Sequence, residues 1–229
     1  MNTGDTLDEI RQRIARAAQR SGRSVDDVRL IAASKRQPVA AIEMLIAHGQ
    51  RDFGENQMQE AIEKIGQLQE QAVEWHFIGH LQSNKSRHAG SAFDWVHTVD
   101  SIKLARRIAA SAVEAERTVR ILLQINISGD PAKHGINPGD LFPLVDILFE
   151  EQPVGVQVCG LMTIGRRNAT ETESRAAFAD LRLLLEQCRE RFGESFSELS
   201  MGMSRDFELA VEEGATMLRI GTALFGNTR

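Results

Sequence analysis

The chain has 229 residues, of which 42% are hydrophobic and 26% are charged, which is enough for one large core or two small ones. The formal net charge of −5 argues against a nucleic-acid partner, because proteins that bind nucleic acid present excess positive charge to the phosphates. No apolar run approaches the length that crosses a bilayer, and the first ten residues hold three acids and no apolar signal segment. We therefore expect a soluble, cytoplasmic protein without a membrane partner.

An amphipathic helix is predicted before the first strand. Thr6 to Glu9 reads T-x-x-E, the pattern of a capping box at the start of a helix. Ser21 and Gly22 then mark its end. Between these points apolar residues recur at helical spacing, at Leu7, Ile10, Ile14 and Ala17.

An apolar run at residues 28–33 predicts a strand that delivers Lys35 at its end. The run is nearly continuous, as in a parallel strand buried on both faces, and Pro38 then opens a helical pattern. An ammonium group beside an apolar core is costly, because desolvation disfavours the charged form. Such a lysine is a good nucleophile toward an aldehyde, or it can pair with a phosphate or carboxylate. The alternative is a lysine that is solvated in the loop, as most lysines are.

Strand and helix patterns alternate through the rest of the chain. Most strand-length apolar runs are followed by apolar residues at helical spacing, and residue 79 is followed by a polar segment that could supply a short helix. Two polar stretches, at 128–140 and 166–174, predict long loops. The further strands are expected at residues 51–56, 74–79, 95–100, 119–127, 157–164, 198–203 and 217–225.

This count gives eight strands, each but the last followed by a helix, with no change of composition that would mark a linker. The pattern predicts one domain over residues 1–229, an α/β fold in the form of a single (β/α)8 TIM barrel with an extra amino-terminal helix. A doubly wound sheet is the competing architecture. It is disfavoured because no G-x-G-x-x-G follows the first strand and because eight regular units favour closure.

Neither the cysteines nor the closely spaced histidines predict a metal site. Cys159 and Cys188 lie far apart without a CxxC partner, so we expect two buried or half-buried thiols. His76 and His80 are four residues apart, which suits a shared metal on a helix. On a strand and its loop they would lie roughly 13 Å apart. We expect His76 to be satisfied by a backbone partner.

In a barrel of this kind the chemistry sits at the carboxyl ends of the strands, and the loops after strands seven and eight often hold a phosphate. Lys35 would end strand one and Asn56 strand two. Closure makes strands eight and one neighbours, so Arg219 and Lys35 should face a common space. Hydroxyls and backbone amides nearby would cradle a phosphate, at Ser200, Gly202, Ser204, Gly221 and Thr222.

A phosphate cradle beside a Schiff-base lysine is what pyridoxal 5′-phosphate (PLP) requires. Segments that span almost the whole barrel resemble the pyridoxal-phosphate homeostasis proteins, single-domain barrels similar to the amino-terminal half of alanine racemase. The segments are SKRQP around Lys35, DFGENQMQE at 52–60, WHFIGHLQSNK at 75–85, SMGMSRDFELAVEEG at 200–214 and RIGTALFG at 219–226.

The resemblance implies a barrel like PLP fold type III and a role for each matching residue. Lys35 would form the internal aldimine, Asn56 would lie near the cofactor, and Arg219 would face the pyridine nitrogen. Two departures from the family pattern are Gln57, where relatives often carry an aromatic residue, and KHG at 133–135, where KSG is expected. The phosphate would be held by residues 200–204 and 221–222, with Ser200, Met203, Ser204, Gly221 and Thr222 as cofactor-binding residues.

The function that the resemblance implies is a carrier or regulator in PLP homeostasis, a monomer that passes PLP to apo-enzymes and lacks robust catalysis. An amino-acid racemase is the first alternative. It needs a second base, which alanine racemase draws from a tyrosine of a second domain. This sequence has no tyrosine and stops just beyond the last strand, so only His76 or His80 would serve. A Schiff-base phosphosugar aldolase or isomerase is the other alternative, and it leaves Arg219 unexplained.

Overall fold

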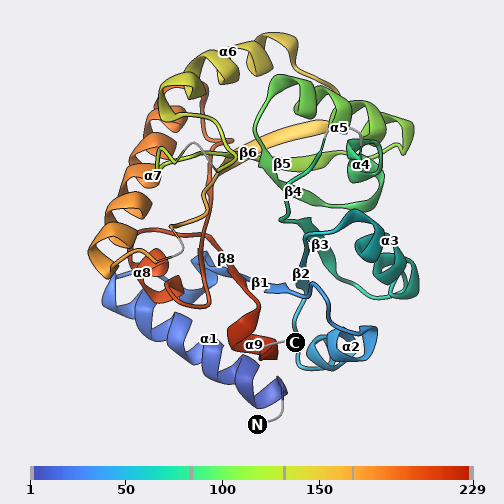
Figure 1. Cartoon of the computed structure of the whole chain (residues 1–229), viewed down its shortest axis with the longest axis vertical. Helices are drawn as coiled ribbons and strands as arrows, with labels where there is room; N and C mark the ends of the chain where they lie inside the picture. Colours follow the sequence, from blue (N-terminus) through green and yellow to red (C-terminus); the bar gives the residue numbers. More distant parts are fainter. Residues whose placement is uncertain (1–2, 83–84, 131–132, 167, 227–229) are drawn as a thin grey trace.

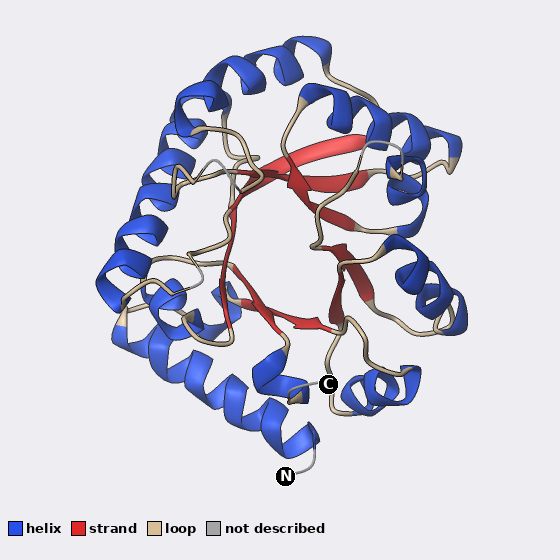
Figure 2. Cartoon of the chain, in the orientation of Figure 1, coloured by secondary structure: helices blue, strands red, loops and turns tan. Residues whose placement is uncertain are grey.

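In the computed structural model, eight parallel strands close into a barrel inside a ring of helices (Figures 1 and 2). The structure describes residues 3–82, 85–130, 133–166 and 168–226. The strands pair in chain order and β8 returns to β1, so the predicted (β/α)8 barrel is confirmed. They are β1 (Arg29–Ala33), β2 (Asp52–Glu55), β3 (Glu74–Phe77), β4 (Trp95–Val99), β5 (Val119–Gln124), β6 (Val156–Met162), β7 (Glu198–Met203) and β8 (Met217–Ile220).

Helices or short helical turns follow every strand, and none of the described helices is both long and apolar enough to cross a membrane. The α-helices are α1 (Thr3–Arg20), α2 (Val39–Ala47), α3 (Met58–Gln67), α4 (Ala89–Ala92), α5 (Ile102–Glu114), α6 (Leu141–Glu151), α7 (Glu171–Phe192), α8 (Phe207–Glu212) and α9 (Thr222–Phe225). The 3₁₀ turns are η1 (Val25–Asp27), η2 (Ser86–His88) and η3 (Pro138–Asp140).

The amino-terminal helix α1 is present as predicted, but it starts earlier than its capping-box pattern suggested. Thr6 lies inside α1 and does not cap it. The added turn is docked, since Gly4 is buried against His48 at the end of α2 so closely that a Cβ atom would clash with the imidazole ring. On its other side Arg13 donates two hydrogen bonds to Glu208 of α8, at 3.0 and 3.3 Å.

The eighth strand is shorter than predicted. It pairs with β1 only from Met217 to Ile220, and residues 222–225 form α9 (Figure 1). A short apolar run fits a strand or a helix equally well, so the sequence pattern did not separate the two. The hydroxyl of Ser204, which follows β7, accepts a hydrogen bond from the Ala223 amide at 3.1 Å and holds the start of α9 against the end of β7.

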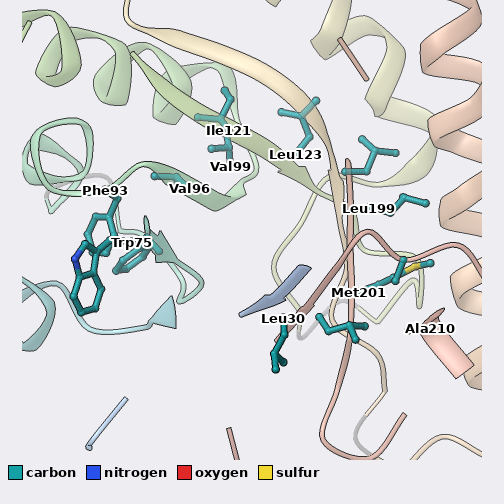
Figure 3. Packing of buried hydrophobic residues seen from close by; sticks show 14 of the residues in the cluster. Leu30, Trp75, Phe93, Val96, Val99, Ile121, Leu123, Leu199, Met201 and Ala210 are labelled. Carbon is teal, nitrogen blue, oxygen red and sulfur yellow. The ribbon is translucent and has the colours of Figure 1, made fainter. Parts of the chain in front are cut away.

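The main core lies between the barrel and the helices, and a smaller one fills the barrel. Leu199 and Met201 of β7 pack with Ala210 of α8 in the outer core (Figure 3). The inner cluster contains Ile31, Trp95, Leu122, Cys159, Met162 and Met217. Cys159 and Cys188 are free and buried, as predicted. Burial raises the pKa of Cys159 to about 11 and that of Cys188 to about 12, so both are unreactive thiols.

A layer of paired charges closes the amino-terminal end of the barrel. Glu74 accepts hydrogen bonds from Arg29 (2.8 Å), Arg120 (2.9 Å) and the Trp95 indole nitrogen (2.9 Å). Arg29 also bonds to Asp52 at 3.2 Å. The guanidinium of Arg120 lies 4.3 Å from the centre of the Trp95 ring. Positive and negative groups therefore neutralise one another at this end.

Candidate functional site

The carboxyl-terminal mouth of the barrel brings the ends of β1 and β8 together. Ile31 of β1 is in register with Arg219 of β8. Ala33 lies two residues beyond Ile31 and therefore on the same face of the strand. Gly221 packs on this strand end, because a Cβ atom there would lie 3.2 Å from the Ala33 carbonyl oxygen. Lys35 and Arg219 thus border one region, as the strand order predicted.

Lys35 is exposed at this mouth, and no hydrogen bond or ion pair of the described residues involves its ammonium group. Of the two alternatives for this lysine, the structure shows the solvated one, with the amine open to a ligand. β1 ends two residues earlier, at Ala33, so the side chain has left the apolar core.

Beneath Lys35, a buried ion pair fixes the preceding residue. Lys64 is 5% exposed and Glu55 is fully buried, and their charged groups lie 2.7 Å apart. The Lys64 ammonium also donates to the Ser34 carbonyl oxygen at 2.8 Å, and the Ser34 hydroxyl donates to Glu55 at 2.7 Å. Burial raises the pKa of Glu55, although the hydrogen bonds from Lys64 and Ser34 oppose it.

The residue after Lys35 is fixed by the same network. Glu60 accepts hydrogen bonds from Lys64 at 2.6 Å and from the Arg36 amide at 2.5 Å. Arg36 has a φ of 59°, a left-handed conformation that is strained for a residue with a side chain. The backbone on both sides of Lys35 is therefore held rigidly while its side chain is not.

Arg219 differs from Lys35 because it is nearly fully buried, with 5% of its surface exposed. Its guanidinium donates to the Ser200 hydroxyl at 2.6 Å and to the Thr163 carbonyl oxygen at 2.8 Å. Both acceptors are neutral. Burial lowers the pKa of Arg219 to about 10, with Asp206 acting in the opposite direction, and the group stays protonated at neutral pH.

A buried column of polar side chains runs from Arg219 down through the barrel. Ser200 contacts His97 at 2.8 Å, His97 contacts His76 at 2.9 Å, and His76 contacts Asp52 at 3.1 Å. Arg219 can only donate and the Asp52 carboxylate can only accept. The hydroxyl proton of Ser200 therefore points to His97 Nδ1, and each histidine donates its Nε2–H toward Asp52. Burial lowers the pKa of both histidines, so both are neutral.

Two residues of this column change what the sequence suggested. The predicted contact of Ser200 with a phosphate stays a prediction, and in this structure its fully buried hydroxyl is hydrogen-bonded to Arg219 and His97. His76 was expected to have a backbone partner, and its partners are the side chains of His97 and Asp52. His97 was not singled out from the sequence. A usable signal was that the neighbouring strands β3 and β4 each carry one histidine, His76 and His97.

The turns after β7 and β8 expose the groups predicted to cradle a phosphate. Ser204 and Gly221 are half-buried and Thr222 is exposed. The backbone hydrogen bonds of α9 start at the Leu224 amide, which reaches the Gly221 carbonyl oxygen at 2.9 Å. The amides of residues 221 and 222 therefore precede the helical hydrogen bonds, a position that suits an anion.

Met203 and Gly202 complete the β7 turn. Met203 is half-buried, and its amide donates to the Asp206 carboxylate at 2.7 Å. Gly202 has a φ of +90°, and a Cβ atom there would come within 2.5 Å of Ala210. Only glycine fits both constraints. Met201 points away into the outer core, so of the two methionines in this segment Met203 is the one near the mouth.

Asn56 supplies an unsatisfied acceptor directly after β2. Its Oδ1 atom is buried and has no hydrogen-bond partner among the described residues. Its backbone lies so close to Gly79 that a Cβ atom on Gly79 would fall 2.3 Å from the Asn56 carbonyl oxygen. A buried acceptor without a partner costs about 1–3 kcal/mol. A ligand with hydrogen-bond donors or a bound water would relieve that cost.

The site therefore combines an exposed amine, a buried guanidinium on neutral acceptors, an orphaned amide oxygen and free turn amides. Pyridoxal phosphate fits this donor set, since it has an aldehyde for an amine, a ring nitrogen that can accept a hydrogen bond, a phenolic oxygen and a phosphate. The sequence analysis singled out these groups but not the network of Ser34, Glu55, Glu60 and Lys64. Its members are spread over SKRQP, DFGENQMQE and the rest of α3. The roles of Lys35, Asn56, Ser200, Met203, Ser204, Arg219, Gly221 and Thr222 toward a cofactor remain predictions.

Comparison with known proteins gives the class first. The family described as alanine racemase, N-terminal domain, matches residues 6–229. Alanine racemase of Clostridium difficile is 13% identical, with a TM-score of 0.74 over 99% of this chain and 57% of that one, a likeness of fold alone. The fold and site thus define a barrel of the alanine racemase amino-terminal type.

Closer relatives give the particular family. The pyridoxal phosphate homeostasis protein of Pseudomonas aeruginosa is 42% identical over 222 residues, 97% of this chain and 94% of that protein. The Escherichia coli protein of the same name is 39% identical over 223 residues, covering 96% and 94%. PipY of Synechococcus elongatus with PLP bound is 42% identical, with a TM-score of 0.80 over 95% of this chain and 100% of that one. The chain belongs to the pyridoxal phosphate homeostasis protein family.

Proposed function

We propose that this protein binds PLP at the carboxyl-terminal mouth of its barrel and serves in PLP homeostasis as a carrier or regulator. The observation that carries the proposal is the exposed Lys35 amine beside the buried Arg219, in a chain 42% identical to a relative solved with PLP bound. When bound, PLP supplies an aldehyde that a lysine amine can hold covalently and a ring that acts as an electron sink.

Each residue of the site has a part in this proposal. Lys35 holds the aldehyde, and the Lys64 network presents it. Arg219 donates to the ring nitrogen, and Ser200 keeps Arg219 in place instead of touching the phosphate. Asn56 Oδ1 accepts a hydrogen bond from the bound ligand or its water. The phosphate is held by Ser204, Gly221 and Thr222, with Met203 against the ring.

We further propose that the protein has no robust enzymatic activity. Arg219 has no carboxylate hydrogen-bonded to it among the described residues and remains protonated at neutral pH. A protonated guanidinium cannot give up a proton to the ring nitrogen, so the nitrogen stays unprotonated and the ring withdraws electrons poorly. The sequence also contains no tyrosine to act as a second base. The neutral, fully buried His76 does not reach the mouth.

The cellular setting of the proposal is a monomer inside the cell that passes PLP to apo-enzymes. Both cysteines are free and buried, which suits a reducing compartment. The exposed Lys35 supports release, since an amine open to solvent can exchange its covalent partner with other amines. Light scattering of the purified chain, and transfer of PLP to a PLP-free enzyme of known activity, test these two points.

The deciding experiment compares the wild type with Lys35→Ala and with Lys103→Ala, which changes an exposed lysine on α5. We expect the wild type and Lys103→Ala to carry the yellow absorbance of a lysine-bound PLP, and borohydride to leave a reduced adduct on the peptide that contains Lys35. Lys35→Ala loses the covalent band but can retain PLP through the phosphate turns. An adduct on another lysine, or no PLP binding by the wild type, would refute the assignment.

A further inference from the structure

A second cluster of side chains lies at the same mouth of the barrel, in the connections that follow β3, β4 and β5; Figure 1 shows these three strands next to one another. His80, Asp100 and His134 each offer one ligand atom, and these atoms all lie within 4.8 Å of one another. The two histidines are exposed and Asp100 is half-buried. The residues come from three different connections, after β3, after β4 and after β5, so only the folded barrel brings them together.

The backbone that carries His80 is fixed. The preceding residue, Gly79, packs directly on Asn56, and its carbonyl oxygen accepts a hydrogen bond from the Thr98 hydroxyl at 2.6 Å. Asp100 directly follows β4 and precedes Ser101, which caps α5 through the Leu104 amide. Two of the three ligands are therefore placed by the rigid frame of the barrel.

The backbone that carries His134 is fixed as well. Its carbonyl oxygen accepts a hydrogen bond from the Gln124 side chain at 2.9 Å, and the Ile136 amide bonds to the Gln124 carbonyl oxygen at 2.8 Å. The Lys133 ammonium group donates a hydrogen bond to the Gly165 carbonyl oxygen at 3.1 Å. Its positive charge is therefore directed toward the turn that follows β6. Asp100 and the two imidazoles thus form an anionic cluster when the histidines are neutral.

The imidazole rings of His80 and His134 stack, with centroids 3.6 Å apart and planes 9° apart. None of the hydrogen bonds of the described residues uses the side chains of His80, Asp100 or His134.

We propose that His80, Asp100 and His134 bind a divalent transition-metal ion of the zinc class. A ligand set of two imidazole nitrogens and one carboxylate oxygen favours such ions over magnesium or calcium, which prefer oxygen ligands. Donor atoms around a tetrahedral zinc lie roughly 3.4 Å apart, given bonds of about 2.0–2.1 Å. Rotation of the two exposed imidazoles out of their stack would close the present separation. Three protein ligands leave a fourth position for water or an exogenous anion.

A bound ion would tie together the connections after β3, β4 and β5. The proposal does not depend on PLP binding, because Lys35 follows β1 and Arg219 lies on β8.

Metal titration of the untagged chain tests the proposal. Zn²⁺ is measured by equilibrium dialysis and metal analysis, and Co²⁺ by its visible d–d bands, with and without PLP, because PLP itself can chelate metals. We expect one ion per chain in either case. His134→Ser should weaken binding by at least about 100-fold, while His134→Cys, which replaces nitrogen by a thiolate ligand, should retain the ion with an altered Co²⁺ spectrum.

The matched control is His88→Ser, which removes a half-buried histidine outside the cluster and should bind as the wild type does. Circular dichroism and PLP content confirm that each variant is folded. Equal Zn²⁺ affinity of the wild type and His134→Ser, or an unaltered Co²⁺ spectrum of His134→Cys, would overturn the proposal. So would the absence of stoichiometric binding to the wild type.

Discussion

The two ends of the barrel interior treat charge in opposite ways. At the amino-terminal end, Glu74 is bonded to Arg29 and Arg120 within 3 Å, so the charges neutralise one another. At the carboxyl-terminal end, Arg219 rests on a hydroxyl and a carbonyl oxygen, and the Lys35 ammonium has no partner among the described residues.

This difference separates a structural end from a binding end. A charge that is paired within the protein has no need of a ligand, whereas an unneutralised buried guanidinium is costly until something accepts its hydrogen bonds. The column from Arg219 through Ser200, His97 and His76 to Asp52 joins the two ends. It fixes the orientation of the Arg219 side chain and places the negative charge of Asp52 at the opposite end of the column.

The largest effect on stability is expected when a buried charge beneath the binding end is left without its partner. Lys64→Met removes the partner of the fully buried Glu55, and we expect it to lower the free energy of unfolding by about 3–5 kcal/mol. Chemical denaturation at neutral pH measures the loss. Lys103→Met, on the exposed face of α5, is the control and should be near neutral.

A second substitution shows whether the loss comes from the orphaned carboxylate. In the double variant Lys64→Met, Glu55→Leu no fully buried charge remains, because the Glu60 side chain is 25% exposed, so most of the stability should return. The Lys35 loop still lacks the hydrogen bond to Ser34 and the support of Glu60. The double variant should therefore bind PLP more slowly than the wild type. A double variant as unstable as Lys64→Met would show that the pair is not the cause.

Arg219→Glu inverts the charge at the binding end. A carboxylate facing the ring nitrogen of bound PLP stabilises its protonated form, which is the stronger electron sink. We expect hydrogen exchange at the α-carbon of added alanine to accelerate on the order of tenfold or more, even if PLP affinity drops. Proton NMR in deuterated water measures the exchange. Arg219→Gln, which is neutral, should show little acceleration, and equal rates in both variants would contradict this account.

Ser200→Ala tests the column more gently. The substitution removes the acceptor that lies 2.6 Å from the Arg219 guanidinium, and a hydrogen bond to a charged group contributes about 1.5–3 kcal/mol. Because Arg219 loses its orientation, PLP affinity should fall about tenfold or more, with the covalent link to Lys35 retained. Spectroscopic titration measures the affinity. Ser197→Ala, at an exposed position just before β7, should bind PLP as the wild type does.

The sequence predicted the barrel because its signal is local and repeated. Each strand is a short apolar run and each helix has a 3.6-residue pattern, and the closure rule then placed Lys35 and Arg219 side by side. It could not predict the column, because His97 and Ser200 are 103 residues apart and only the register of the closed sheet brings them together. Nor could it predict that Lys64 supports Lys35, since a lysine on a helix is usually solvated.

The smallest expected effect is at the structural end, where Glu74→Gln removes one charge from the paired layer. Burial opposes ionisation of Glu74, but hydrogen bonds from Arg120 and Trp95 outweigh it and lower its pKa. A carboxyl group whose pKa is lowered by folding stabilises the protein above its unfolded pKa, and that contribution disappears as the pH falls through the folded pKa. The group is about one-third exposed, so the loss should be only about 1 kcal/mol at neutral pH.

The pH dependence then distinguishes the two ends. The stability difference between the wild type and Glu74→Gln should stay constant from neutral pH down to about pH 5 and shrink below it, as Glu74 becomes protonated in the wild type. Glu55 has the opposite sign, because burial raises its pKa, so Lys64→Met should recover stability on acidification as the orphaned carboxyl takes up a proton. PLP affinity of Glu74→Gln should equal that of the wild type. A marked loss of affinity would show that the paired layer also tunes Arg219 through Asp52, and that the two ends are not separate in function.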